Sequence, residues 1–570
     1  MKNKLYNPVE FKNLREVINN SVKLYENNNA FIIKEKNGSE VSYKNITYKE
    51  FKKDIDSLGT ALLNMGLKGK RVAVISKNRY EWAVSYLAVL NGVGIVIPLD
   101  KSLPPQEIKS LLERSKADAV IFESKYIEVM QEIKAENTKL TKFICMDETE
   151  EDFISYKKIV KTGRTSLEGG NDEYLNSEIK EEEMSIILFT SGTTSLSKAV
   201  MLSHRNIASN IYALNTVVKI YNTDVNLAFL PFHHTFGSTG LLFFLSNGAA
   251  NAFCDGLKYI AQNLAEYKIS VFVSVPLLLE AMYKKIMKQV EKQGKTKTVE
   301  MGVKLTKALR KVGVDVRRKV FKEIIDNLGG SLRLVVTGAA AIDRKVAEGF
   351  NDFGITTIQG YGLTETAPVL SAENDKFIEY GSVGFPMINV EIEIDNPNEE
   401  GIGELKAKGP NVMLGYYENE EATNEVLKDG WFYTGDLAYK DKKGAIHITG
   451  RKKNVVVLKN GKNIYPEEIE LLINNLIYVK ESMVFGLPKD DDLLLSAKIV
   501  FDEDYIKANW EDTSEEGIKE KIWQDIKEIN KDMVTYKHIK HIIVTNEEMI
   551  KTTTAKIKRF EEIKKICEEN

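Results

Sequence analysis

The sequence predicts an α/β protein of more than one domain, in which a large N-terminal part precedes a smaller α+β unit. Short apolar runs alternate with segments of helical periodicity through the first part, which is typical of a parallel sheet with helices on both faces. The composition changes near Gly450, and the chain beyond it has its own strands and helices. A length of 570 residues also exceeds what one ordinary hydrophobic core accommodates.

The first clear helix is predicted by its own end signals. Thr47 and Glu50 form a capping box, apolar residues follow at helical spacing, and Gly66 ends the helix. Further along, apolar runs predict strands beginning at Arg71, Val93 and Ala119, separated by helices at 80–90 and 103–115. In the C-terminal unit, strands are expected at Ser482–Leu487, Ala497–Phe501 and Ile539–Thr545.

Three longer segments need separate interpretation. The polar stretch 148–183 is predicted to be a loop-rich connection. Residues 225–254 contain no charged side chain and are numerous enough to span a bilayer, but their glycines, histidines and Pro231 favour buried strands and loops that line a pocket. Residues 280–328 are basic and helical, and a solvated helical face is favoured there over a surface for lipid headgroups or a protein partner.

Composition narrows the class of protein. The 79 basic and 82 acidic residues give a net charge of −3, without the basic excess expected of a nucleic-acid-binding protein. The N-terminal residues are charged throughout and contain no apolar core of a signal peptide. Cys145, Cys254 and Cys567 are far apart and show no metal-ligand spacing, which suits a reducing cytoplasm.

The strongest local signal is a phosphate-binding loop within residues 186–204. An apolar strand leads into a run of hydroxyl residues around one glycine, and Lys198 follows. Backbone N–H groups can converge on an anion there, while the hydroxyls add donors and the lysine adds charge. The spacing differs from the Walker A pattern, which argues against an ordinary P-loop kinase or ATPase. The phosphate-binding residues are predicted to be Thr190, Ser191, Gly192, Thr193, Thr194 and Lys198.

This loop resembles the signature of the adenylate-forming superfamily, which includes acyl-CoA synthetases, luciferases and peptide-synthetase adenylation domains. The chain keeps Thr-Ser-Gly-Thr-Thr and the lysine, but Ser195 and Ala199 replace usual glycines and Ser197 replaces a usual proline. The resemblance implies a large AMP-binding domain of stacked α/β subdomains at 1–450 and a small, mobile α+β domain at 451–570.

A second motif of the superfamily lies at residues 359–366. In it, Tyr361 is in position to stack on adenine, and Glu365 is the residue expected to hold Mg²⁺. An upstream stretch that follows the run LRLVV lines the adenine and acyl pockets in relatives. The resemblance therefore assigns nucleotide contacts to Gly338, Ala339, Ala340, Gln359, Gly360, Tyr361, Gly362 and Thr364.

Three later segments complete the resemblance in family order. Asp436 corresponds to the aspartate that takes the ribose hydroxyls, and Arg451 to the arginine that contacts ribose and phosphates. Lys453 stands at the hinge, and Lys556 is the expected catalytic lysine. The last motif departs from the family at two residues, because Ile550 replaces its proline and Ala555 its glycine.

The implied activity is ATP-dependent ligation of a carboxylic acid to coenzyme A through an acyl-adenylate, with Lys556, Glu365 and Lys198 as catalytic residues. The helical 280–328 segment and the hinge run resemble the long-chain fatty acid branch, and the 225–254 segment is expected to line the acyl tunnel. Substrate contacts are assigned to His233, His234, Gly338 and Thr366, although a structural role for either histidine is nearly as well supported.

Several alternatives stay open at this stage. A medium-chain or aryl acid, or the phosphopantetheine arm of a carrier protein as acceptor, is compatible with the same motifs. The glycine losses also admit a non-catalytic member that only binds nucleotide or acyl chains, although every charged motif residue is intact. The protein is expected to be cytoplasmic, with peripheral membrane contact and the choice between monomer and homodimer left open.

Overall fold

The computed structural model describes residues 3–38, 40–136, 139–190, 197–459, 462–489, 492–552 and 556–569. These residues divide into two compact units. The first unit contains residues 3–190, 198–392 and 407–432, and the second contains Ser197, 393–406 and 433–569. The predicted α/β class, with a larger N-terminal and a smaller C-terminal part, is confirmed.

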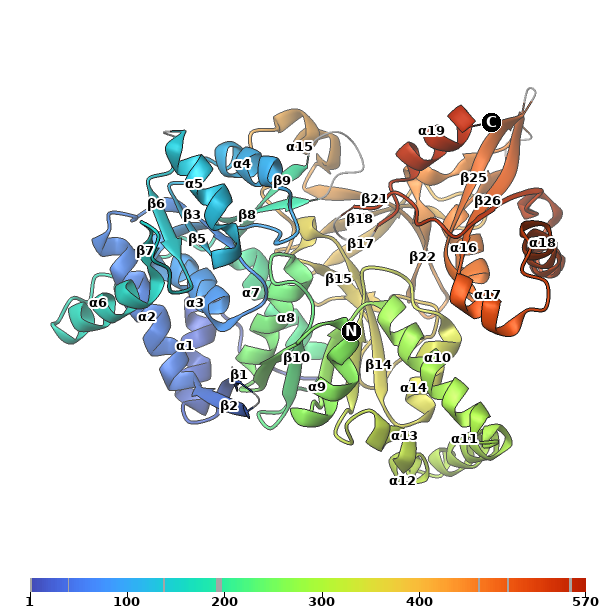
Figure 1. Cartoon of the computed structure of the whole chain (residues 1–570), viewed down its shortest axis with the longest axis horizontal. Helices are drawn as coiled ribbons and strands as arrows, with labels where there is room; N and C mark the ends of the chain where they lie inside the picture. The colour runs from blue at the N-terminus through green and yellow to red at the C-terminus, as the bar shows by residue number, and fades with distance from the viewer. Residues whose placement is uncertain are drawn as a thin grey trace. The chain divides into compact units, whose positions relative to one another are not determined.

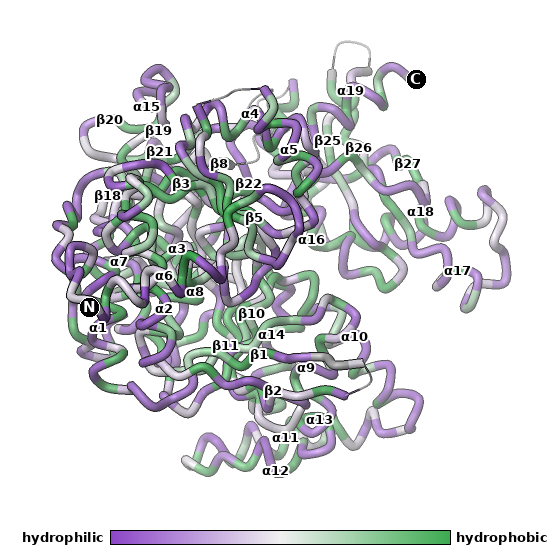
Figure 2. The backbone as a smooth tube through the Cα atoms, turned by 60° about the vertical axis from the view of Figure 1, so that its left-hand side comes forward, coloured by the Kyte–Doolittle hydropathy of each residue, from purple (hydrophilic) through white to green (hydrophobic). Residues whose placement is uncertain are grey.

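One sheet of the first unit has eight strands, mostly parallel as predicted. In pairing order they are β19 (Gly415–Tyr416), β9 (Lys198–Ser203), β8 (Met184–Thr190), β4 (Gly94–Pro98), β3 (Lys70–Ile75), β5 (Ala119–Phe122), β6 (Lys142–Cys145) and β7 (Ile154–Ser155). Only β9 and β19 run antiparallel to their neighbours. The strands at the centre are apolar on both faces, as the green tubes of β3 and β5 show in Figure 2, because helices cover both sides.

A second sheet of the same unit has nine strands. Their pairing order is β16 (Phe385–Pro386), β15 (Val369–Ala372), β14 (Thr356–Gly362), β13 (Leu334–Thr337), β12 (Val271–Ser274), β10 (Val225–Ala228), β11 (Ala250–Phe253), β1 (Asn29–Asn37) and β2 (Glu40–Thr47). The six strands from β14 to β1 are parallel to one another. Their carboxyl ends therefore lie at one edge of the sheet, where ligand-binding loops of open α/β sheets gather.

Helices join the two sheets of the first unit into one core. A single hydrophobic cluster contains Val72 of β3, Phe31 of β1, Trp82 of α3 and Leu241 of α8. The helices that contribute to it are α1 (Leu14–Tyr25), α2 (Tyr48–Asn64), α3 (Tyr80–Ala88), α7 (His204–Val217) and α8 (Thr235–Ser246). The capping box predicted at the start of α2 is present.

Two segments contain helices that the sequence did not predict. The 148–183 connection holds α6 (Tyr156–Glu168), whose buried residues are only Tyr156 and Gly163. A Cβ at Gly163 would lie 1.8 Å from the Ser57 carbonyl oxygen, so α6 approaches the α2 backbone closely there, while Ile159 and Val160 pack against the hydrophobic core. The charge-free 225–254 segment contains α8, which shows no amphipathic pattern because it is buried on nearly every side.

The other helices of the first unit are peripheral. Around the first sheet lie α4 (Pro105–Arg114) and α5 (Ile127–Ala135), and beside the second lie α9 (Ile260–Glu266) and α14 (Arg344–Asp352). The basic 280–328 segment is helical as predicted, with α10 (Pro276–Lys292), α11 (Thr296–Lys311), α12 (Arg317–Val320) and α13 (Lys322–Asn327) grouped near α14 in Figure 1. None of the helices among the described residues combines the length and apolar character needed to cross a bilayer.

A five-stranded sheet contains two of the segments that resemble motifs of the superfamily. In pairing order, four of its strands are β17 (Glu391–Asp395), β18 (Gly403–Lys408), β21 (Trp431–Lys440) and β20 (Leu427–Lys428), and β22 (Ile446–Arg451) also pairs with β21. Helix α15 (Glu420–Val426) directly precedes β20. The second unit then forms a core of its own, with β25 (Val479–Lys489), β26 (Asp492–Phe501) and β27 (His541–Thr545) beside α16 (Pro466–Asn474) and α18 (Glu515–Lys531). The three strands predicted there lie in these elements. The hairpin of β23 (Val456–Val457) and β24 (Asn463–Ile464), with α17 (Glu503–Asn509) and α19 (Arg559–Glu569), completes the unit.

Candidate active site

The predicted phosphate loop is carried by the hairpin of β8 and β9. Thr190 ends β8 and Lys198 begins β9, and the two residues are paired across the hairpin. The Thr190 hydroxyl donates a hydrogen bond to the Lys198 carbonyl at 3.3 Å. Ser191, Gly192, Thr193 and Thr194 lie outside the described residues, as does Ser195. The hairpin therefore holds Thr190 and Lys198 at the two ends of the loop.

Tyr416 connects Lys198 with the predicted metal ligand Glu365. The Lys198 ammonium lies 4.6 Å from the centre of the Tyr416 ring. The Tyr416 hydroxyl donates to Glu365 Oε1 at 2.9 Å, and the Met413 N–H donates to the Glu365 carbonyl at 2.8 Å. Tyr416 is 5% exposed and lies on β19, paired with Val200 of β9. A cation and a carboxylate from distant parts of the sequence are thus held by one aromatic side chain.

The turn that carries Glu365 is fixed by buried amides. Thr364–Thr366 form a short 3₁₀ turn, and the buried Thr366 hydroxyl donates to the Pro368 carbonyl at 2.6 Å. The Asn411 amide donates to the Thr366 carbonyl at 2.9 Å, and the Asn210 amide to the Val369 carbonyl at 2.9 Å. These bonds satisfy the carbonyls that an isolated turn leaves without partners. Glu365 is therefore presented from a backbone with little freedom to move.

The predicted adenine-binding residues meet at the carboxyl ends of β13 and β14. Thr337 and Gln359 are paired in parallel register, so the residues that follow them, Gly338 and Gly360, lie side by side. A Cβ at Gly338 would lie 3.1 Å from the Gly360 carbonyl oxygen. Ala339 and Ala340 are exposed, and the Tyr361 side chain is half-buried. This edge therefore offers small residues and one aromatic ring, which suits a flat base.

Gly362 is required by packing. A Cβ there would lie 1.7 Å from the Pro368 carbonyl oxygen, far inside contact distance.

A buried carboxylate, Glu373, braces the same strand because it accepts from the Gln359 N–H and the Glu379 N–H, each at 2.8 Å. Burial raises the pKa of Glu373 to about 8 despite these bonds.

The two predicted substrate histidines stand in the connection between β10 and α8. His234 directly precedes α8, and His233 is buried beside Asp100. Asn78 holds the connection by donating to the Leu230 carbonyl at 2.8 Å and accepting from the Phe232 N–H at 2.9 Å. Thr239 of α8 donates to the Ala367 carbonyl at 3.3 Å, which brings this helix to the residue after Thr366. A cavity of about 10 Å³, enough for about one water molecule, lies among β10, α8 and Val273.

In the second unit, Asp436 and Arg451 form a pair. They stand opposite each other on antiparallel strands β21 and β22, with Arg451 Nε 2.6 Å from Asp436 Oδ1. The Asp436 N–H donates to the Thr434 hydroxyl at 3.1 Å, and that hydroxyl donates to the Leu405 carbonyl at 2.7 Å. The Asp436 side chain is 7% exposed, whereas that of Arg451 is 40% exposed. A carboxylate acceptor beside a guanidinium suits a ligand with hydroxyls and phosphate.

Lys453 and Lys556 lie elsewhere in the second unit. Lys453 is exposed in the short turn Lys452–Asn454, where Asn454 donates to Glu467 Oε1 at 2.6 Å. Lys556 is exposed in the chain between β27 and α19, and its N–H donates to the Thr552 hydroxyl at 3.2 Å.

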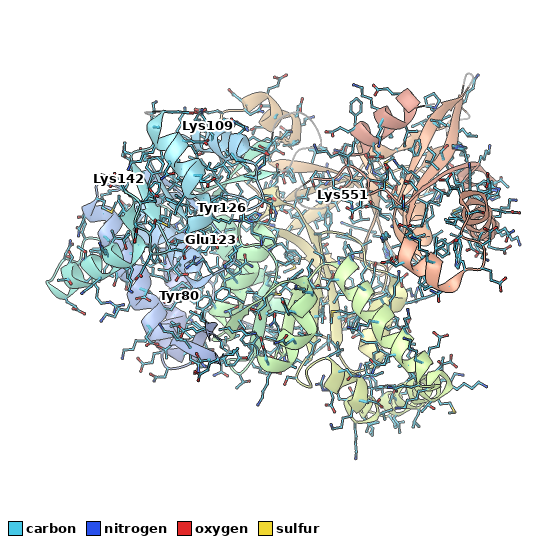
Figure 3. The ribbon with its side chains drawn as sticks, in the orientation of Figure 1. Tyr80, Lys109, Glu123, Tyr126, Lys142 and Lys551 are labelled. Atoms are coloured by element: carbon cyan, nitrogen blue, oxygen red, sulfur yellow. The ribbon has the colours of Figure 1, made fainter. Side chains whose placement is uncertain are left out.

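The chain on either side of Lys556 is anchored to the core of the second unit. Lys551, labelled in Figure 3, pairs with Ile557 and makes an ion pair with Glu481 at 2.9 Å. Glu562 of α19 makes a buried ion pair with Lys498 and accepts from the Ile550 N–H at 3.0 Å.

Comparisons with known proteins agree over nearly the whole chain. The sequence pattern of the AMP-binding enzyme family matches residues 20–417, and that of the AMP-binding enzyme C-terminal domain matches residues 453–567. The chain belongs to the AMP-binding enzyme family. It is 30% identical to long-chain-fatty-acid–CoA ligase 5 of Mus musculus, over 91% of this chain and 82% of that protein. It is 27% identical to fatty acyl-CoA synthetase B of Dictyostelium discoideum, over 90% of this chain and 79% of that protein.

A solved structure shows the same fold. The crystal structure of an anthranilate CoA ligase in complex with anthranoyl-AMP superposes with a TM-score of 0.78 at 20% identity, over 99% of this chain and 98% of that one.

In this AMP-binding enzyme, the structure joins some of the predicted site residues in three local groups, to which His233, His234, Lys453 and Lys556 do not belong. The first joins Lys198 and Glu365, the second joins the residues after β13 and β14, and the third joins Asp436 and Arg451. Tyr416, Asn210 and Asn411 were missed by sequence reasoning. Each is a single residue in a stretch without a pattern, and Tyr416 contacts a carboxylate 51 positions away. Only the close approach of β19 to β9 reveals its role.

Proposed function

We propose that this AMP-binding enzyme is an AMP-forming ligase that activates a long-chain fatty acid as acyl-AMP, releases pyrophosphate and transfers the acyl group to coenzyme A. The observation that carries the proposal is the Lys198–Tyr416–Glu365 group, which holds a cation and a carboxylate where the phosphate loop ends. The similarity to the mouse ligase over most of both chains supports the choice of acid.

The chemistry requires charge to be neutralised and aligned. A carboxylate is a poor electrophile, so its oxygen must first attack the α-phosphorus of ATP, forming a mixed anhydride from which a thiol displaces AMP. Lys198 and the loop 190–194 would hold the β- and γ-phosphates, and Lys556 would bridge the acid and the α-phosphate. A lysine suits that task because it is a compact charge on a flexible stem. Preorganised charges of this kind account for much of enzymatic rate enhancement.

Glu365 is suited to hold Mg²⁺ between phosphates. Mg²⁺ prefers one or two carboxylates, together with phosphate oxygens and water, over a complete cage of protein ligands. The 2.9 Å hydrogen bond from Tyr416 occupies Glu365 Oε1 and orients the carboxylate, which is the usual role of an outer partner of a metal ligand. When bound, the ion would supply positive charge to the phosphate oxygens.

The adenine and ribose contacts are proposed for the residues that the structure brings together. Adenine would stack on Tyr361 beside the small residues Gly338, Ala339 and Ala340. Asp436 would accept the ribose hydroxyls, and Arg451 would contact ribose and phosphate. The acid would lie near His233, His234, Gly338 and Thr366, in line with the packing of α8 against the chain after Thr366.

We further propose that residues 1–450 act as the AMP-binding domain and that residues 451–570 move about Lys453 between the two half-reactions. Lys453→Pro would restrict the backbone at that point, because proline fixes φ near −65°. Thioester formation is expected to fall while pyrophosphate release continues, whereas Lys453→Ala should preserve both. Equal loss of both half-reactions in Lys453→Pro would contradict the hinge.

We propose peripheral membrane contact for helices α10 to α13, in place of the solvated face that the sequence favoured there. Exposed apolar side chains stand among their lysines and arginines, a combination that suits an anionic lipid surface. Leu277 is 67% exposed, Met301 63% and Val312 74%. The chain should sediment with vesicles of anionic phospholipid and not with zwitterionic ones, and binding should weaken as salt rises. Equal binding to both vesicle types would contradict the charge argument.

The ligase is tested by pyrophosphate release from ATP with acids of increasing chain length, with and without coenzyme A. Release should peak at a long-chain acid, turn over with coenzyme A, and fall by about 100-fold or more in Lys556→Ala. Turnover with a carrier-protein thiol and not with coenzyme A would reassign the acceptor. ATP binding without release, whatever the acid, would identify a non-catalytic family member.

A further inference from the structure

Three side chains with metal-binding atoms meet in the first unit, and two of them belong to the 225–254 segment that is expected to line the acyl tunnel. Asp100 stands in the connection from β4 to α4, and His233 and His234 stand in the connection from β10 to α8. His233 Nε2 lies 3.4 Å from Asp100 Oδ1, and the two imidazole rings are 4.2 Å apart between centroids with a tilt of 57°. One donor atom from each residue lies within 4.8 Å of the other two.

One ring nitrogen of the buried His233 lacks a hydrogen-bond partner within the part of the chain that the structure describes. His233 is 6% exposed, and its Nε2 has no hydrogen-bond partner among the described residues although it faces the Asp100 carboxylate. A buried polar atom left in this state destabilises the fold because it has lost its hydrogen bonds to water. A cation placed between this ring nitrogen and the carboxylate would give the nitrogen the partner that it lacks.

The donor set selects the class of ion. Two imidazoles and one carboxylate are typical of zinc and of the neighbouring transition metals, whereas Mg²⁺ and Ca²⁺ prefer oxygen donors alone. In tetrahedral zinc with bonds of about 2.0–2.2 Å, neighbouring donor atoms are about 3.3–3.5 Å apart. The His233–Asp100 distance of 3.4 Å already fits this geometry, while the widest pair must close by small side-chain rotations.

We propose that Asp100, His233 and His234 form a binding site for a divalent transition-metal ion of the zinc and cobalt class. The site shares no residue with the Mg²⁺ position proposed at Glu365. Three protein ligands leave at least one coordination position for water or another ligand.

Positive charges near the site should lower its affinity for a metal ion. The positive N-terminal end of α8 begins directly after His234, and such an end disfavours a cation. Lys101 and Lys125 are also close to Asp100, where the Lys125 ammonium and the hydroxyl of Tyr126, labelled in Figure 3, both donate to the Lys101 carbonyl. The site should therefore bind its ion more weakly than a closed structural zinc site.

A consequence for catalysis rests on the proposed function. The same two histidines are proposed to contact the acid, so a bound ion should compete with the acid and raise its KM. The metal site itself does not depend on that assignment, because ion binding can be measured without substrates.

The test is a Co²⁺ titration of the full chain after chelator treatment, followed by visible absorption and equilibrium dialysis. The unmodified protein should bind one Co²⁺ per chain with the absorption of a four- or five-coordinate site, and Zn²⁺ should displace it. Asp100→Asn and His234→Gln should each weaken binding at least 10-fold. An asparagine at position 100 keeps an acceptor for the Ser102 N–H, now bonded at 2.8 Å, and thermal melting checks that both variants fold.

A matched control lies in the second unit. His447 Nε2 is also 3.4 Å from an aspartate, Asp441, but no third residue completes a group there among the described residues. His447→Gln should leave Co²⁺ binding unchanged. No Co²⁺ uptake by the unmodified protein, unchanged binding in both triad variants, or equal loss in His447→Gln would each overturn the proposal. Loss of Co²⁺ binding in folded Asp100→Asn that still releases pyrophosphate would support the metal site independently of the ligase.

Discussion

Removal of one hydroxyl group should separate the role of Tyr416 from that of its ring. In Tyr416→Phe, Glu365 Oε1 loses the hydrogen bond of 2.9 Å, while the ring remains 4.6 Å from the Lys198 ammonium. A hydrogen bond to a charged group contributes roughly 1.5–3 kcal/mol, and loss of an outer partner of a metal ligand commonly costs about 10–100-fold in affinity or activity. The cation–π contact, about 0.5–1 kcal/mol at an exposed site and more when desolvated, should persist.

The assay is pyrophosphate release as a function of Mg²⁺ concentration at saturating ATP and acid. Tyr416→Phe should raise the Mg²⁺ concentration for half-maximal release about 10-fold or more, and excess Mg²⁺ should restore much of the rate. Tyr416→Leu removes both the hydroxyl and the ring, so its loss should be larger and less fully restored by Mg²⁺.

The neighbouring tyrosine provides the control. The Tyr417 hydroxyl accepts from Arg71 at 2.7 Å and donates to Glu418 at 3.1 Å, without contact to Glu365. Tyr417→Phe should therefore leave the Mg²⁺ dependence unchanged. A Mg²⁺ dependence in Tyr416→Phe equal to that of the unmodified enzyme would refute the idea that this hydroxyl orients the metal ligand.

Three further predictions concern stability. Burial raises the pKa of Glu373 to about 8, so this side chain is protonated more readily in the folded than in the unfolded chain. The free energy of unfolding should therefore fall by about 3 to 5 kcal/mol between about pH 4.5 and pH 8. Urea unfolding at several pH values should show a flatter pH profile for Glu373→Gln than for the unmodified protein. Glu562→Ala leaves Lys498 buried without its partner and should destabilise the second unit by about 3–5 kcal/mol, measured by thermal unfolding. Glu561→Ala, which removes a 47% exposed side chain from its ion pair with Lys558, should change little. Gly362→Ala should lower the melting temperature sharply, because its Cβ would lie 1.7 Å from the Pro368 carbonyl oxygen, while Gly360→Ala, with 3.4 Å to the nearest atom, should melt as the unmodified protein does.

The sequence alone determined the features that depend on neighbours along the chain. Apolar runs located the strands from Arg71 and Ala119, and the Thr47–Glu50 capping box located the start of α2, because strand burial and helix capping are read from adjacent residues. The motifs ending in Lys198, Glu365 and Lys556 were recognisable for the same reason, since each is a short contiguous string. Helix α6 was missed because its apolar residues are few among polar ones, although Tyr156, Ile159, Val160 and Gly163 recur at helical spacing on the side that packs against the core.

Only the tertiary structure decided which of these residues meet. Tyr416 contacts Lys198 and Glu365 because β19 pairs with β9, and Asp100 faces His233 because two connections converge at one edge of the first unit. Neither contact follows from periodicity or spacing, since the partners are separated by tens to hundreds of residues. Local patterns determine which secondary structure a segment adopts, whereas long-range strand pairing and core packing determine which side chains share a site.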